Sequence, residues 1–145
     1  MSYKGRFKPK YPEKYAGDPT NIIYRSLWEL RLMRYFDQHP SVLVWGSEEL
    51  TIPYVSPVAR RVHRYYPDFI VKMREKTGNV TTTMIEVKPY VQTIEPKKNP
   101  SHPRRYLNEV MKYGVNQAKW KAAQEFCEDR NWKFRIMTEH DIGVK

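Results

Sequence analysis

The order of apolar and turn-forming segments along the 145 residues predicts an α/β fold. Two long segments place apolar residues at a spacing of three or four, which is typical of amphipathic helices. Between them, the β-branched run Thr81–Val87 follows turn-forming residues, which predicts a hairpin. We therefore expect the order helix, three or four strands, helix, strand. A chain of this length fits one compact domain, so we expect a single domain over residues 20–145 behind an N-terminal arm, 1–19.

The two helices follow from the spacing of their apolar residues. The first is expected over residues 20–38, where Asp18 or Thr20 can supply the N-cap. The second is expected over residues 104–129, after a proline-rich loop that cannot continue a helix. A short apolar alternation after it predicts the last strand over residues 133–137.

The strands before the loop are shorter and are recognised by β-branched and apolar runs. Thr77, Gly78 and Asn79 are turn-forming residues, so residues 66–73 and 81–88 should pair as a hairpin. The expected strands before the second helix are Val42–Trp45, Leu50–Val55, one within residues 61–72, and Thr81–Val87.

The composition points to a polyanionic partner. The formal net charge is +10, the pI is about 9.7, and aromatic residues make up 14% of the chain. In a folded chain this favours nucleic acid, with a membrane surface a distant second and a basic protein without such a partner as the alternative. No apolar run is long enough to span a membrane, so we expect no membrane partner. The single cysteine, Cys127, excludes an internal disulfide and fits a reducing cytoplasm, and we expect it to serve packing.

Basic residues occur in three groups that we expect to contact a nucleic-acid backbone. In the N-terminal arm they alternate with aromatic residues, a pattern that suits both phosphate contact and base stacking. The alternative for the arm is that it packs along its own domain, and both can hold. The expected phosphate-binding residues are Lys4, Arg6, Lys8 and Lys10 in the arm, Arg60, Arg61 and Arg64 in the strand region, and Lys97, Lys98, Arg104 and Arg105 around the start of the second helix. Phosphate contacts carry no sequence information, so we expect little sequence preference.

Three polar residues converge at one end of the predicted hairpin. Asp68 begins one strand, while Glu86 and Lys88 project from the same face of the other because side chains alternate along a strand. Two carboxylates are hard oxygen ligands for Mg²⁺, and a nearby ammonium can stabilise negative charge as it develops on a phosphate. The alternative is a surface salt bridge. The apolar residues that flank Glu86 place it in a strand with a buried face, which favours the catalytic interpretation.

Several separated motifs in this order resemble the PD-(D/E)XK nuclease superfamily. Within it, the chain resembles the branch shared by the Tn7-type transposon endonuclease subunit and the tailed-phage head completion nucleases. The arm is similar to the phage form, and the similarity covers nearly the whole chain. The matching segments are Tyr24–Glu29, Tyr66–Phe69, Ile85–Pro89, Lys119–Ala123, Trp132–Phe134, and in the arm Tyr3–Lys10 and Gly17–Asn21.

The resemblance implies a restriction-endonuclease-like core, a mixed β-sheet flanked by helices. It also implies that Glu29 joins Asp68 and Glu86 around a metal ion, whereas the alternative for Glu29 is a surface carboxylate paired with Arg25 or Arg31. Weaker candidates are Gln117 and Lys121, which share a face of the second helix, and His63, as a proton shuttle or phosphate contact. Solvated surface positions are the alternative for these three.

By this resemblance we expect a Mg²⁺-dependent deoxyribonuclease, an endonuclease in which Mn²⁺ can substitute, acting in phage head completion after DNA packaging. The expected partners are DNA and phage portal or head-completion proteins, in the cytoplasm of the infected bacterial host or in the virion head. The main alternative is a non-catalytic head component that retains the nuclease fold to bind DNA. A transposase-type subunit is disfavoured because 145 residues leave no room for the extra domain of such subunits.

Overall fold

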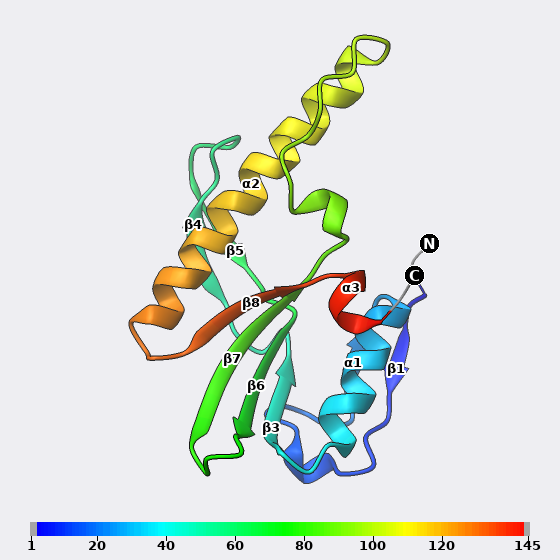
Figure 1. Cartoon of the computed structure of the whole chain (residues 1–145), viewed down its shortest axis with the longest axis vertical. Helices are drawn as coiled ribbons and strands as arrows, with labels where there is room; N and C mark the ends of the chain where they lie inside the picture. Colours follow the sequence, from blue (N-terminus) through cyan, green and yellow to red (C-terminus); the bar gives the residue numbers. More distant parts are fainter. Residues whose placement is uncertain (1–2, 144–145) are drawn as a thin grey trace.

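The computed structural model describes residues 3–143 and centres on one four-stranded mixed sheet. The strand order is β3-β6-β7-β8, with neighbouring strands antiparallel except for the parallel pair β7–β8. Helix α1 lies on one side of this sheet and the long helix α2 on the other (Figure 1). The bounds are α1 Leu27–Gln38, β3 Val42–Ser47, β6 Phe69–Arg74, β7 Val80–Val87, α2 Pro103–Glu128 and β8 Lys133–Met137. The predicted α/β class with a mixed sheet is confirmed.

Two small antiparallel pairs and three short helical segments complete the described chain. The first pair precedes α1, and the second lies between β3 and β6 in the sequence. These elements are β1 Gly5–Phe7, η1 Pro12–Lys14, β2 Ile22–Tyr24, β4 Ile52–Val55, β5 Val62–Tyr65, η2 Tyr90–Gln92 and α3 Glu139–Ile142. No helix in residues 3–143 combines the length and the apolar content that crossing a membrane requires.

The first face of the sheet carries an aromatic core around Trp45. Its indole is fully buried and meets Phe36 of α1, Phe69 of β6, and the N-terminal residues Phe7 and Tyr15 edge-on or tilted. Aromatic pairs at these centroid distances add to the apolar burial that joins α1 to the sheet.

The second face carries a separate core under α2. Side chains alternate along β7, so Ile85 enters the Trp45 core while Met84 enters this second one. Trp120 and Ala123 of α2 pack on that face, together with Tyr65 of the β4–β5 hairpin. The buried thiol of Cys127 lies 3.9 Å from the Met84 sulfur, consistent with the packing role predicted for it. Only the C-terminal half of α2 is buried in this way, and the N-terminal half projects from the body (Figure 1).

The N-terminal segment packs along the domain. Asp37, buried at the end of α1, accepts hydrogen bonds from the backbone N–H groups of Lys10 and Tyr11 at 2.8 and 3.1 Å. The Lys14 ammonium donates to the carbonyl oxygens of Asp37 and His39. Between them these bonds fasten the segment to α1 while its other basic side chains remain exposed.

The predicted start of the first helix at residue 20 is wrong. Residues 22–24 form β2, which pairs with β1, and the helix begins only at Leu27. Ser26 is the N-cap, and its hydroxyl accepts the backbone N–H of Glu29 at 3.1 Å. The apolar residues at 22–24 satisfied the helical spacing, but a strand partner 15 to 19 residues away in the sequence decided their conformation.

Strand β1 in the N-terminal segment was not predicted. After the first helix, the strands agree with prediction except within residues 61–72, where two strands replace one. Pro67 separates β5 from β6, and the two strands belong to different sheets. The hairpin of β6 and β7 is confirmed, and Gly78 adopts the left-handed conformation (φ 90°) that its turn requires. The last strand is confirmed at residues 133–137. Helix α3 was not predicted, and its four residues depend on a capping box between Thr138 and Asp141.

Candidate active site

Asp68 and Glu86 lie side by side where the β6–β7 ladder ends. Phe69 pairs with Ile85, so the next position in the same register places Asp68 opposite Glu86. The Asp68 carboxylate accepts the backbone N–H of Val87 at 2.8 Å, which extends the ladder through a side chain. Both acids face the α2 side of the sheet, because they alternate with Phe69 and Ile85 of the Trp45 core.

The two carboxylates have little contact with solvent. Glu86 is buried, and its Oε1 atom has no hydrogen-bond partner within the described residues. Burial, followed by the neighbouring charge of Glu86, raises the pKa of Asp68 to about 8. The Val87 N–H and the Lys88 ammonium act in the opposite direction on that pKa. A buried acid beside a half-buried one, with so little compensation, is costly unless a cation joins them.

The pair fits a divalent cation of the Mg²⁺ type. Both groups offer hard oxygen ligands, and the partnerless Oε1 atom of Glu86 is an acceptor that nothing in the described chain satisfies. Within residues 3–143, no three His, Cys, Asp or Glu side chains stand close enough together to form a complete metal cage. Asp68 and Glu86 would therefore hold such an ion with water or substrate oxygens in its remaining positions.

Lys88 follows Glu86 on the same strand edge. Its backbone N–H donates to the Met137 carbonyl of β8 at 3.0 Å, which fixes the chain just past the end of β7. Its ammonium lies near enough to Asp68 to lower the pKa of that carboxyl. The structure thus brings together the three residues that the sequence singled out.

Glu29 approaches the same carboxylates from α1. Its side chain accepts the Arg25 backbone N–H at 3.3 Å and lies 3.5 Å from the Ser26 hydroxyl. Burial and the charge of Asp68 raise the pKa of Glu29, which places the two acids in electrostatic range of each other. Arg31, one proposed salt-bridge partner, instead donates to the carbonyl oxygens of residues 142 and 143.

The three weaker candidates lie elsewhere. Gln117 and Lys121 are on the exposed side of α2, and His63 accepts a hydrogen bond from Arg61 at 3.3 Å within the β4–β5 hairpin. Lys119 is the α2 residue that leans toward the site, with its ammonium 5.7 Å from the centre of the Tyr65 ring. The Tyr65 hydroxyl is buried beside Glu86, and burial followed by that charge raises its pKa.

The sequence analysis did not predict the ion pair between Arg25 and Glu48, which borders the carboxylate site. Arg25 Nη1 lies 2.7 Å from Glu48 Oε1, and Glu48 follows β3 directly, beside Asp68. Glu48 follows β3, Asp68 precedes β6 and Glu86 is the last residue but one of β7, and the strand register places these three acids in one row. No local pattern in the sequence indicated the contact between Arg25 and Glu48.

The basic residues predicted to contact a phosphate backbone are all exposed, on three separate parts of the surface. One group lies on the N-terminal segment, one on the β4–β5 hairpin, and one in the loop before α2 and in the first turn of that helix (Figure 1). The helical rise of 1.5 Å per residue puts Pro103 roughly 25 Å from Trp120, where α2 meets the sheet.

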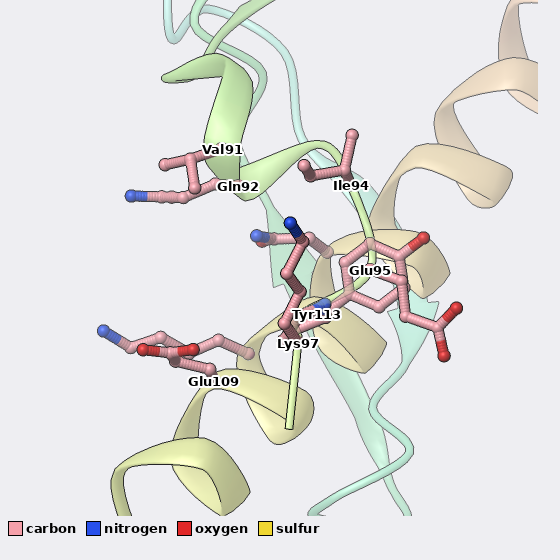
Figure 2. Close-up of a pocket in the computed structure, with 10 residues that line it drawn as sticks. Val91, Gln92, Ile94, Glu95, Lys97, Glu109 and Tyr113 are labelled. Atoms are coloured by element: carbon pink, nitrogen blue, oxygen red, sulfur yellow. The ribbon is translucent and has the colours of Figure 1, made fainter. Parts of the chain in front are cut away.

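A surface pocket of about 540 Å³ lies between the loop after β7 and α2. Figure 2 shows Val91, Ile94, Lys97, Glu109 and Tyr113 among the residues that line it. Neither Asp68 nor Glu86 lines this pocket, so it is separate from the carboxylate pair.

Comparison with known proteins identifies the class. The model of the TnsA-like endonuclease N-terminal family matches residues 39–139, a range that contains Asp68, Glu86 and Lys88. The chain belongs to this endonuclease family.

A particular relative narrows the class further. The chain is 40% identical over 147 residues to the head completion nuclease of Enterobacteria phage T4, which covers 98% of this chain and 95% of that protein. Fold and matches together define a nuclease of the head-completion type.

Proposed function

We propose that this nuclease is a Mg²⁺-dependent DNA endonuclease whose centre is Asp68, Glu86 and Lys88. The observation that carries the proposal is the pair of adjacent carboxylates at the end of the β6–β7 ladder, in which Glu86 is buried with an unsatisfied oxygen and Asp68 is half-buried. A structural component has no need for two such acids side by side, because the pair destabilises the fold unless it binds a cation.

Each residue has a distinct task. Asp68 and Glu86 would hold the cation, and Glu29 would add negative charge from α1. The bound ion supplies the activation of the attacking water and offsets charge on the phosphate. Lys88 stabilises the negative charge that develops on the phosphate oxygens and orients the water. Mn²⁺ should substitute, since it also takes oxygen ligands.

Exposed basic groups and the net charge of +10 support DNA as the substrate. We place its action in head completion after DNA packaging, in the cytoplasm of the infected bacterial host or in the virion head, with portal or head-completion proteins as partners. The relative that carries the head-completion name spans almost the same length, which supports this placement.

The test is cleavage of supercoiled, linear and branched DNA with Mg²⁺, with Mn²⁺ and with EDTA. We expect metal-dependent cleavage by the wild type and its loss in Asp68→Asn and in Lys88→Ala. Lys72→Ala is the matched control, because Lys72 is an exposed lysine on β6, in the same sheet. Tight DNA binding without cleavage of any form would instead support the non-catalytic head component.

A further inference from the structure

Arg25 and Glu48 form an ion pair at the rim of the carboxylate site. Arg25 lies between β2 and the Ser26 cap of α1, and its Nη1 atom is 2.7 Å from Glu48 Oε1. The side chains are 50% and 34% exposed, so the pair faces solvent on one side. On the other side it borders the acids, because the charges of Glu29 and Asp68 act on Arg25 as well as that of Glu48.

The backbone at Glu48 is held in an unfavourable conformation. Its φ of 54° lies in the left-handed region that disfavours residues with a side chain. Its N–H donates to the Asp68 carbonyl at 3.1 Å, so the turn continues the row of strand ends that carries Asp68 and Glu86. A glycine would adopt this φ at lower energetic cost. The strain therefore indicates that the Glu48 side chain makes a contact that offsets it, and that contact is with Arg25.

Tyr15 fixes the same turn from the N-terminal segment. Its hydroxyl accepts the backbone N–H of Ser47 at 3.1 Å and bonds to the Glu49 carboxylate at 2.8 Å. The residues on both sides of Glu48 are thereby anchored. Its carboxylate is a fixed support for the guanidinium.

The guanidinium keeps donors free for another anion. The contact with Glu48 involves Nη1, and arginine carries five N–H donors in a planar fork. That fork matches the oxygens of a phosphate, and arginine binds phosphate more specifically than lysine does. The Arg25 side chain is half exposed and borders the carboxylates, so a nucleic-acid strand that reaches them can contact it.

We propose that Arg25 binds a backbone phosphate of the strand at the active site, and that Glu48 is a positioning residue that orients the guanidinium for this contact. The proposal deepens the proposed function and rests on it, because the phosphate belongs to the nuclease substrate. The alternative is an ion pair that contributes only to folding.

The first experiment measures binding of a short labelled duplex over a range of KCl, in the Lys88→Ala background so that the DNA stays intact. Arg25→Gln should weaken binding at low salt roughly 10-fold or more. It should also reduce the slope of log K against log salt by about the amount that one phosphate contact contributes. Arg25→Lys keeps the charge and should restore the slope. Arg34→Gln is the matched control, since Arg34 is an exposed arginine on α1.

The second experiment measures cleavage kinetics with Lys88 intact. Arg25→Gln should lower kcat/KM about 10- to 100-fold, and Arg25→Lys should recover only part of it because lysine lacks the planar fork. Glu48→Gln should lose less than Arg25→Gln, and the double variant should match Arg25→Gln alone, because Glu48 acts through Arg25. Thermal melting of each variant separates these effects from unfolding.

An Arg25→Gln protein with the salt slope and kcat/KM of Arg34→Gln would overturn the proposal, as would additive losses in the double variant. Failure of the proposed nuclease function would give a different experimental result. A wild type that binds but never cuts would sink the proposed function, while the salt slope would still decide the phosphate contact of Arg25.

Discussion

The Asp68 carboxylate accepts the backbone N–H of Val87 at 2.8 Å, across the last step of the β6–β7 ladder. This bond fixes one oxygen of Asp68 and leaves the other beside Glu86, which stands opposite in the extended register. The backbone pairs of β6 and β7 run from Phe69 to Arg74 and do not include Asp68, so the ladder does not depend on its carboxylate.

Asp68→Asn should abolish cleavage and keep the fold. The amide oxygen can still accept the Val87 N–H, whereas the charge that attracts a cation is gone. We expect a loss of at least about 100-fold in kcat/KM, measured on supercoiled DNA with Mg²⁺, and circular dichroism equal to the wild type. If the variant still cleaved DNA, Asp68 would not be part of the active site.

The stability of the metal-free protein should fall as the pH rises from about 4 to about 8. The pKa of Asp68 is raised to about 8 in the folded chain. Ionising this carboxyl is therefore less favourable in the folded state than in the unfolded state, and the free energy of unfolding falls as the pH rises. In EDTA, urea unfolding should therefore show Asp68→Asn more stable than the wild type at pH 8 by more than about 1 kcal/mol. The difference should vanish near pH 4, and a constant difference would contradict the assignment.

Mg²⁺ should stabilise the folded protein through the same pair. At concentrations of 10 to 100 times the dissociation constant, a ligand that binds only the folded state contributes about 1–3 kcal/mol. Thermal melting should show a rise with Mg²⁺ in the wild type and in Lys72→Ala, and none in Asp68→Asn or Glu86→Gln. An equal rise in Glu86→Gln would show that the ion binds elsewhere.

Asp37→Asn should loosen the N-terminal segment. The amide can replace only one of the two carboxylate oxygens that accept the Lys10 and Tyr11 N–H groups, and it lacks their charge assistance. We expect a loss of about 1–3 kcal/mol in urea unfolding, with faster proteolysis within residues 3–15. Glu13→Gln, at an exposed position, should change neither.

The projecting end of α2 should contribute DNA affinity without chemistry. Replacing Lys97, Lys98, Arg104 and Arg105 by alanine should reduce the slope of log K against log salt. The reduction should correspond to the loss of up to about four phosphate contacts. The value of kcat at saturating DNA should stay the same, because Lys97 and Lys98 lie in the loop before α2 and Arg104 and Arg105 in its first turn, whereas α2 meets the sheet at Trp120 and Ala123. A matching loss from Arg60→Ala, Arg61→Ala and Arg64→Ala would assign the β4–β5 hairpin to the same interface, and a fall in kcat would contradict a purely electrostatic role.

Tertiary contacts decided several features that no local pattern indicated. The first helix begins at Leu27 because residues 22–24 pair with β1, and apolar spacing alone does not reveal that partner. Lys119, and not Gln117 or Lys121, leans over Tyr65, because the rotation of α2 is set by Trp120 and Ala123 in the core. Arg25 meets Glu48 only because β2 and the end of β3 come together in space.

Local patterns in the sequence were sufficient to predict the hairpin, the long second helix and the last strand, and to place Asp68, Glu86 and Lys88 on one edge. Each of these depends on neighbours in the chain: strand alternation, turn-forming residues and helical spacing are local properties. The catalytic role of the three residues stays a prediction. The burial that raises the pKa of Asp68, the packing of the N-terminal segment and the Arg25–Glu48 pair were decided by the tertiary structure alone. They depend on contacts between residues distant in the chain, which only the folded sheet brings within reach.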